Sequence, residues 1–258
     1  MHRAAVLALM AALAPQQVLG DLSKLAPPAK GKVRLYLCRH GQTDWNAENK
    51  IQGSVDRDLN ALGERQALLI GEALKAVPVT LVAASPLRRA FRTADLAMDV
   101  ACPGADGVRI ENGLREMHFG VLEGAVAAES ELYAATNAAW ASGQVDRAWP
   151  EGESPKAVET RGRLALAGLG LLGQPVDAVP PHTHVAVVCH GRFNKILLSS
   201  ILGRGVYQCG AIQQGNCCIN VVDIDVSAPV DAPAPTTVVV LDSRDHLAGL
   251  DQCDADKT

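Results

Sequence analysis

Residues 33–46 have the sequence VRLYLCRHGQTDWN, an apolar run that stops at three residues suited to binding chemistry. Val33 to Leu37 is predicted to be a buried strand. Arg39 presents a planar fork of donors that matches phosphate oxygens. His40 can act as a base, a ligand or a nucleophile, and Gly41 lets a bound group approach the backbone closely. By itself, this triplet leaves a purely structural histidine open.

Four further segments stand out: two follow strand candidates, one opens a predicted helix, and one is itself an apolar strand candidate. They are SPLRRAFRTA (85–94), LREMHFGVLEG (114–124), WPEGES (149–154) and VAVVCHG (185–191). The last is an apolar strand candidate that ends in His-Gly, as the first strand does. In this order and spacing, the five segments resemble the histidine phosphatase superfamily, which includes cofactor-dependent phosphoglycerate mutases and fructose-2,6-bisphosphatase. The resemblance extends from about Lys32 to Leu247.

Strand candidates alternate with helical patterns along most of the chain, which is typical of an α/β fold. The expected strands are 33–37, 79–84, 108–110, 185–189, 217–226 and 237–241, and the expected helices are 60–76, 87–98, 154–173 and 193–201. The resemblance implies a three-layer α/β/α sandwich with a mostly parallel central sheet and a small helical cap. We expect a histidine phosphatase-like domain over residues 32–250, with a cap segment at 117–155 and a solvated acidic tail at 251–258.

The first twenty residues differ in kind from the rest. A short basic start, the apolar run Ala4–Ala14 and small residues near Gly20 predict a secretory signal peptide cleaved after Gly20. An organellar transit peptide is the alternative, because the first acidic residue is Asp21. The apolar part is too short to span a bilayer. We expect a secreted or organellar protein after cleavage, or a cytoplasmic one if the leader is retained.

The seven cysteines cannot all pair with one another. Cys38 and Cys189 lie at the ends of apolar strands. Cys217 and Cys218 are adjacent in another expected strand, where their side chains would face opposite sides. No Cys-x-x-Cys spacing indicates a metal site. The pattern predicts free buried thiols, which fits poorly with export through an oxidising compartment, so the compartment stays open.

The resemblance assigns roles to five side chains in an attack on a phosphate monoester, a group with about two negative charges at neutral pH. Arg39 and Arg89 would clamp the phosphate oxygens, and His40 would be the nucleophile. His190 would help to hold the transferred group. Glu116 would protonate the leaving oxygen and then accept a proton from water. This set is chemically complete without a metal or another cofactor.

Residues near these motifs have lesser expected roles. Loop groups that could touch the phosphate are Gln42, Thr43, Asn46 and Gly191. Arg88 and Arg92 are expected to face solvent or form ion pairs, and Arg161 is expected to be structural. Tyr133 and Trp140 are two helical turns apart and share a face, which we expect to pack on the core rather than line a pocket.

Two other classes of function use the same residues. A metal hydrolase could take His40, His190 and Glu116 as ligands, but Arg39 and Arg89 beside the site would oppose a divalent cation. A non-catalytic phosphate-binding module could share the fold, but we would expect it to have lost the nucleophile or the acid. The net charge of −4 and the lack of a basic block argue against nucleic acid. The expected partner is a small-molecule monoester, and a homodimer stays open.

The cap segment bears on the substrate. Residues 117–155 contain one cation, Arg147, against several acidic residues. A phosphoglycerate mutase or a sugar bisphosphatase needs cations for a second anionic group. We therefore favour a phosphatase for monoesters with an uncharged or apolar remainder, with a mutase as the alternative. Cations from outside the cap, such as Arg88, Arg92 or Lys195, would change that balance.

Overall fold

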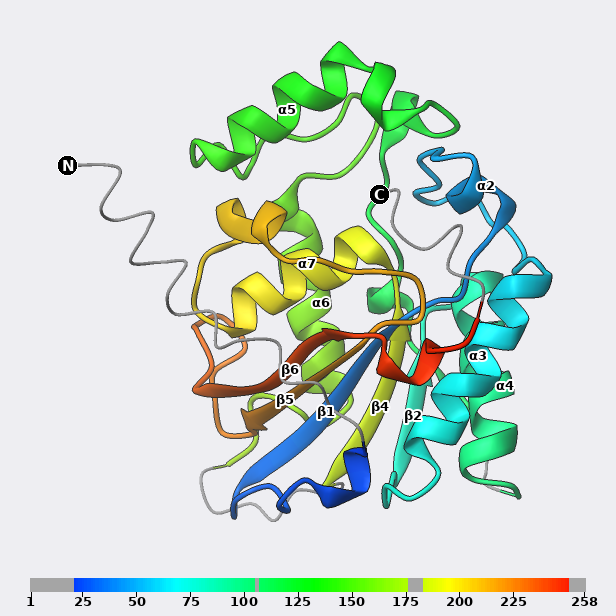
Figure 1. The fold of residues 1–258 in the computed structure, drawn as a ribbon. Helices are drawn as coiled ribbons and strands as arrows, with labels where there is room; N and C mark the ends of the chain where they lie inside the picture. Colours follow the sequence, from blue (N-terminus) through cyan, green and yellow to red (C-terminus); the bar gives the residue numbers. More distant parts are fainter. Residues whose placement is uncertain (1–20, 105–106, 176–182, 251–258) are drawn as a thin grey trace.

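A computed structural model describes residues 21–104, 107–175 and 183–250 (Figure 1). The expected leader (1–20) and acidic tail (251–258) lie outside the described residues, so both stay predictions. Within the described ranges, no helix is long and apolar enough to cross a membrane.

Six strands form one mixed sheet at the centre of the described chain (Figure 1). They are β1 (Lys32–Arg39), β2 (Leu81–Ala84), β3 (Arg109–Ile110), β4 (His184–Cys189), β5 (Ile219–Asp225) and β6 (Thr236–Ser243). Their order is β3-β2-β4-β1-β5-β6. The first four in that order pair in parallel, whereas β5 pairs antiparallel with both β1 and β6. Within this sheet only β5 runs against the others, which confirms a mostly parallel sheet.

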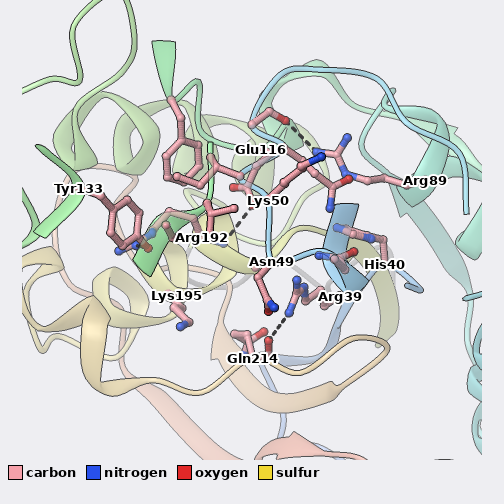
Figure 2. Close-up of a pocket in the computed structure, with 18 of the residues that line it drawn as sticks. Arg39, His40, Asn49, Lys50, Arg89, Glu116, Tyr133, Arg192, Lys195 and Gln214 are labelled. Carbon is pink, nitrogen blue, oxygen red and sulfur yellow. Dashed lines mark hydrogen bonds between the residues drawn. The ribbon is translucent and has the colours of Figure 1, made fainter. Parts of the chain in front are cut away.

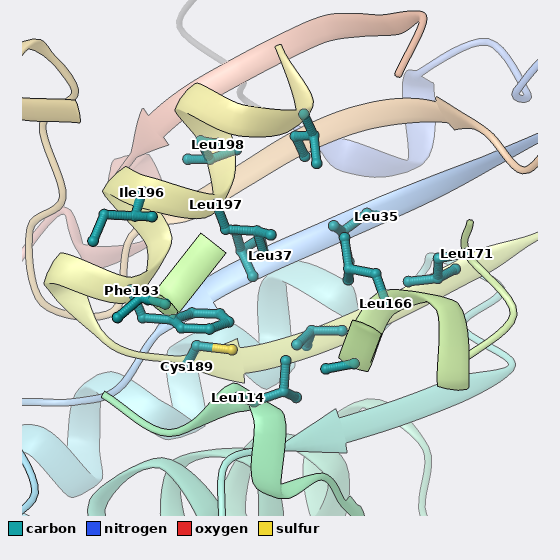
Figure 3. Packing of buried hydrophobic residues seen from close by; sticks show 14 of the residues in the cluster. Leu35, Leu37, Leu114, Leu166, Leu171, Cys189, Phe193, Ile196, Leu197 and Leu198 are labelled. Carbon is teal, nitrogen blue, oxygen red and sulfur yellow. The ribbon is translucent and has the colours of Figure 1, made fainter. Parts of the chain in front are cut away.

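Helices cover both faces of the sheet because successive residues of β1 point to opposite sides. The described α-helices are α2 (Asp44–Ala47), α3 (Ala61–Leu74), α4 (Arg88–Ala101), α5 (Glu131–Ala141), α6 (Pro155–Gly168) and α7 (Gly191–Ile201). Leu35 and Leu37 of β1 are fully buried in a core cluster with α6 and α7 (Figure 3). Tyr36 and Cys38 belong to a second cluster with α3 and α4. The three-layer α/β/α sandwich is thus confirmed.

Polar and glycine residues set the ends of these helices. Asn60 caps α3 and Ser154 caps α6, each side chain accepting a backbone hydrogen bond from the first turn. α6 ends five residues before the expected residue 173 because Gly170 adopts φ 77. The amide of Leu171 then donates back to the Leu166 carbonyl at 2.9 Å, which closes the helix as a Schellman motif.

The cap lies over one end of the sheet, with α5 as its main helix (Figure 1). Its packing centres on Trp149, which is 1% exposed. The rings of Phe119 and Tyr133 stack on Trp149 at 5.6 Å each, and Trp140 meets it edge-on at 4.6 Å. Trp140 is buried as expected, but Tyr133 both packs on this cluster and lines the cavity described below. The expectation that the shared face avoids the pocket is therefore wrong for Tyr133.

The six cysteines within the described ranges are free, as predicted. Four of them, Cys38, Cys189, Cys217 and Cys218, are fully buried. Cys217 has φ 54, and both it and Cys218 precede β5 rather than lying in it. The expected alternation of these two side chains across a strand is therefore wrong.

Candidate active site

The carboxyl ends of β1 and β4 meet at a cavity of about 520 Å³ (Figure 2). The two strands pair in parallel with Arg39 opposite Cys189, so the next residues, His40 and His190, emerge at the same edge. The helix after β2 brings Arg89 to this edge, because β2 is the other neighbour of β4. Two distant His-Gly motifs are thus placed side by side by sheet topology alone.

His40 is held as a neutral imidazole with one defined tautomer. Its Nδ1 lies 2.7 Å from the Gly41 carbonyl oxygen, which can only accept, so Nδ1 carries the proton. Burial, together with the charges of Arg89 and Arg39, holds the pKa of His40 well below its usual value. Nε2 therefore keeps its lone pair at neutral pH, as a nucleophile requires.

The backbone around His40 is fixed by close contact with the start of α3. A side chain on Gly41 would place its Cβ 2.4 Å from the carbonyl oxygen of Gly63, and one on Gly63 would lie 2.1 Å from the carbonyl oxygen of Gln42. The Gly41 amide also donates to the Thr93 hydroxyl at 3.0 Å. These contacts position the loop that carries His40.

Arg39 and Arg89 are buried cations with donors to spare. Arg39 Nη1 donates to the Gln214 carbonyl at 2.6 Å. Arg89 donates through its two terminal nitrogens to the carbonyls of Val55 and Gly53, at 2.9 and 2.8 Å. Burial lowers the pKa of both, that of Arg89 to about 10, so both remain cations at neutral pH. Each Nε is buried without a hydrogen-bond partner among the described residues, a state that costs about 1–3 kcal/mol or more unless a ligand satisfies it.

Glu116 is oriented by three backbone amides. Its Oε1 accepts from Met117 and Phe193, both at 2.8 Å, and its Oε2 accepts from Arg192 at 3.1 Å. Two of these donors belong to the first turn of α7, where the helix end carries partial positive charge. Arg161 donates to the Glu116 carbonyl at 3.0 Å and pairs with Glu153, so it is structural, as expected.

His190 is fully buried beside the nucleophile candidate. The centroids of the His40 and His190 rings are 5.2 Å apart. His190 Nε2 shares a 2.8 Å hydrogen bond with the Ser85 hydroxyl, and its Nδ1 is buried with no partner in the described chain. Burial and the Arg89 charge hold the pKa of His190 well below its usual value.

The structure brings most of the predicted site residues together. Arg39, His40, Asn46, Arg89, Glu116 and Gly191 line the cavity. A side chain on Gly191 would come within 3.2 Å of Arg39 Nε, so glycine makes room for that guanidinium. His190, Gln42 and Thr43 are not among the residues that line the cavity; His190 is fully buried beside His40. Gln42 accepts from the Asn60 side chain at 2.9 Å, and Thr43 caps α2, so both lie one layer behind the predicted contact.

Three further cavity residues carry charges: Lys50, Arg192 and Lys195. Of these, only Lys195 was named from the sequence, as a cation that could reach the substrate from outside the cap. Arg192 and Lys195 are on α7, directly after the second His-Gly motif. Arg192 donates to the Tyr133 hydroxyl at 2.6 Å and to Asn137 at 2.9 Å, both on the cap helix α5. The short spacing from His190 was the available signal, since the first turns of such a helix start at the sheet edge.

The expected shortage of cations in the pocket is wrong. Arg147, the one cation of the cap, is absent from the described lining, but five cations from other segments are present: Arg39, Lys50, Arg89, Arg192 and Lys195. The number of cations in the cap segment was a poor guide to the charge of the cavity, because α7 and the loop after β1 form much of the cavity wall. Arg88 and Arg92, as expected, form ion pairs on the surface.

No group of three or more His, Cys, Asp or Glu side chains in the described ranges is arranged to hold a metal ion. The cationic and donor side chains that line the cavity instead include the guanidinium groups of Arg39, Arg89 and Arg192, the ammonium groups of Lys50 and Lys195, and the imidazole of His40. Such a set suits a phosphate group, which has three or four acceptor oxygens.

The chain belongs to the histidine phosphatase superfamily (branch 1), whose sequence pattern matches residues 35–230. That range holds both His-Gly motifs and every predicted site residue. The matched family agrees with the three-layer fold and with the pair of neighbouring histidines.

The known relatives include proteins named as mutases and a protein named as a phosphatase. The chain is 35% identical over 199 residues to a protein of Citrobacter koseri named "Probable phosphoglycerate mutase GpmB", covering 76% of this chain and 86% of that one. The namesake of Klebsiella pneumoniae is 36% identical over 196 residues, with the same coverage. The solved structure of a mycobacterial glucosyl-3-phosphoglycerate phosphatase matches with a TM-score of 0.69 at 29% identity, covering 82% of this chain and 99% of that one.

Proposed function

We propose that the protein is a phosphatase that hydrolyses phosphate monoesters through a phosphohistidine at His40. The observation that carries the proposal is the unprotonated Nε2 of His40 beside two buried guanidinium groups with unpaired Nε donors. A phosphate dianion between Arg39 and Arg89 would satisfy those donors and neutralise both charges.

In the first step, His40 Nε2 attacks phosphorus, and the bond from phosphorus to the leaving oxygen breaks. Arg39 and Arg89 stabilise the charge on the equatorial oxygens. Glu116 acts as the general acid: it gives a proton to the leaving oxygen and is then a carboxylate. His190, whose ring centroid lies 5.2 Å from that of His40 and whose Nδ1 is unpaired in the described chain, is the second imidazole next to the reacting one.

In the second step, water attacks the phosphoryl group and the bond from phosphorus to Nε2 breaks. Glu116 accepts the water proton, so inorganic phosphate leaves and the enzyme returns to its starting state. The three amides that hold Glu116 keep its oxygens at the same place in both steps.

The shape of the cavity favours hydrolysis over transfer. A volume of about 520 Å³ is in the range of about 300–1,000 Å³ that holds drug-sized ligands. A three-carbon acid would leave room for water, which occupies about 30 Å³ per molecule. The cap contributes the apolar residues Val126, Ala127 and Ala128 to the wall and no cation. A mutase must instead keep water from its phosphohistidine.

A phosphoglycerate mutase is the second candidate. Two observations favour it: the printed names of the relatives from Citrobacter koseri and Klebsiella pneumoniae, and the cations of α7 in the cavity. A non-catalytic module would show neither hydrolysis nor isomerisation.

One preparation assayed for both reactions separates these functions. We expect phosphate release from monoesters to exceed isomerisation of 3-phosphoglycerate, even with 2,3-bisphosphoglycerate supplied, because water can enter the cavity. Isomerisation that is tenfold faster than hydrolysis, about 1.4 kcal/mol in barrier, would make the protein a mutase. Absence of both reactions would favour the binding module.

Extensive chelator treatment should leave hydrolysis unchanged, because Arg39, Arg89 and His190 already provide the polar groups that hold the phosphoryl group. Phosphate release is measured before and after treatment, with an established zinc-dependent phosphatase as the positive control for chelation. Activity that disappears with chelator and returns with Zn²⁺ or Mn²⁺ would support the metal-hydrolase alternative.

A further inference from the structure

The charges that line the cavity are unbalanced even when a phosphate is bound. Five cations face one carboxylate, that of Glu116, among the described lining residues. A phosphate dianion at Arg39 and Arg89 accounts for two of the cations. With a monoester bound, part of the positive charge of the lining is therefore not neutralised.

The remaining cations differ in what already surrounds them. Lys50 pairs with Glu48 at 2.6 Å near the rim. Arg192 is held by its bonds to α5, and the Glu116 charge acts on it. Lys195 is different, because no hydrogen bond or ion pair within the described ranges reaches its ammonium group. Among the five cations of this lining, Lys195 is the one without a hydrogen bond or ion pair to a described residue, although the charge of Asp242 acts on it.

Lys195 is a half-buried cation close to other positive charges. Burial and the nearby charges of Arg192 and Arg39 lower its pKa to about 8. An ammonium group placed beside two guanidinium groups is repelled by them, and partial burial removes water that would screen the repulsion. A surface lysine could extend into solvent, whereas Lys195 lines the cavity instead.

Figure 2 shows where this cation lies relative to the reacting groups. Lys195 and Arg192 are on the α7 side of the cavity, and His40 and Arg89 are on the other side. A group bound at Lys195 would therefore be a different part of the substrate from the phosphate at His40.

We infer that Lys195 is a specificity-determining residue that binds a second anionic group, a carboxylate or a phosphate, on the leaving part of the substrate. The inference rests on the proposed phosphatase function and narrows it to monoesters that carry another negative charge. An anion at this position would pair with the ammonium group and offset its repulsion by Arg192 and Arg39. The sequence-based expectation of an uncharged remainder is replaced by this proposal.

The test compares phenyl phosphates that carry a carboxylate at the 2-, 3- or 4-position with the matching carboxamides. The readout is the ratio of kcat/KM between each charged substrate and its neutral partner, which does not depend on the folded fraction of the enzyme. We expect at least one ratio of about tenfold or more in the wild-type enzyme, the scale of one charge-assisted hydrogen bond. Lys195→Met should reduce that ratio to near one, and Lys195→Arg should keep most of it.

The same ratio should depend on pH. A lysine is a cation below its pKa, so preference for the carboxylate is present below about pH 8 and is lost above it. The groups that act on Lys195 are Arg192 from its own helix, Arg39 from β1, Cys209 from the 3-10 helix Val206–Ala211, and Asp242 from β6. In Lys195→Arg the fall near this pH should disappear, since a guanidinium stays charged.

Each outcome decides something different. Ratios near one for all three pairs in the wild-type enzyme, or ratios that Lys195→Met leaves unchanged, would overturn the inference while hydrolysis itself stands. No hydrolysis of any phenyl phosphate, or hydrolysis that survives His40→Ala, would overturn the proposed function, and the inference would fall with it.

Discussion

Replacing His40 with alanine is expected to lower phosphatase turnover by about 10⁴-fold or more, the scale on which loss of a nucleophile acts in other covalent enzymes. The structure gives the physical reason. Nε2 of His40 is unprotonated, because Nδ1 donates to Gly41 and because burial beside Arg89 and Arg39 keeps the ring neutral. Among the described lining residues, no other side chain offers an imidazole nitrogen to the phosphate.

A labelling experiment checks the same assignment. Brief exposure to a labelled monoester followed by rapid quench should leave label on the wild-type protein that is stable to base and lost in acid, as for a phosphohistidine. His118→Ala is the matched control, since this half-exposed ring lies near Glu123 and is not part of the described cavity lining. It should label and turn over normally. Near wild-type turnover in His40→Ala would show that another group is the nucleophile.

Arg89→Ala should be the next most damaging change, with a loss of about 2.7–4 kcal/mol of transition-state stabilisation, or 10²- to 10³-fold in rate. Arg89 is fully buried, and its Nε is left for the phosphate once Val55 and Gly53 have taken the terminal nitrogens. Arg39→Ala is expected to act on the same scale. Arg88→Ala is the matched control, because the preceding arginine is exposed and pairs with Asp56 and Asp58.

Loss of the two carbonyl contacts could also destabilise the Arg89 variant, so activity alone is not enough. The thermal unfolding midpoint and the affinity for inorganic phosphate are measured together. A folded Arg89→Ala protein should bind phosphate more weakly and turn over more slowly. A folded variant within threefold of the wild-type rate would remove Arg89 from the mechanism, and an equal loss in Arg88→Ala would point to a general effect of helix α4.

The parts of the site that follow a strand could be predicted from sequence. Each His-Gly motif ends an apolar run, and a buried strand can expose such a polar group only at its end. His40 and His190 were located in this way, whereas Arg89, on the helix after β2, was assigned from the family resemblance. Family resemblance was needed to expect that they meet, because the pairing of β1 with β4 joins segments about 150 residues apart, and no local pattern encodes that pairing.

The charges around the substrate could not be predicted in the same way. Lys195 and Arg192 share a helix with Phe193 and Ile196, which pack into the core. Which side of α7 meets the cavity depends on how that helix lies on the sheet. Conversely, Gln42 follows the motif directly but turns away, since its side chain is engaged by Asn60. Reasoning from nearness in sequence therefore placed Gln42 and Thr43 at the cavity wrongly and missed Lys50 and Arg192.

The contact between Gly41 and Gly63 has a consequence for how the enzyme would meet its substrate. The backbone of the loop after β1 packs directly against the backbone of α3 there, so no side chain lies between them that could rotate and let the loop shift. His40, the proposed nucleophile, is therefore already in position before anything binds, and ordering it would cost no binding energy. The position of the Glu116 carboxylate depends instead on backbone amides of α7. Arg192 of the same helix also donates hydrogen bonds to the cap helix α5. Evolution of new substrate specificity can thus change the cap and the residues around Glu116, while the loop that carries His40 stays in place.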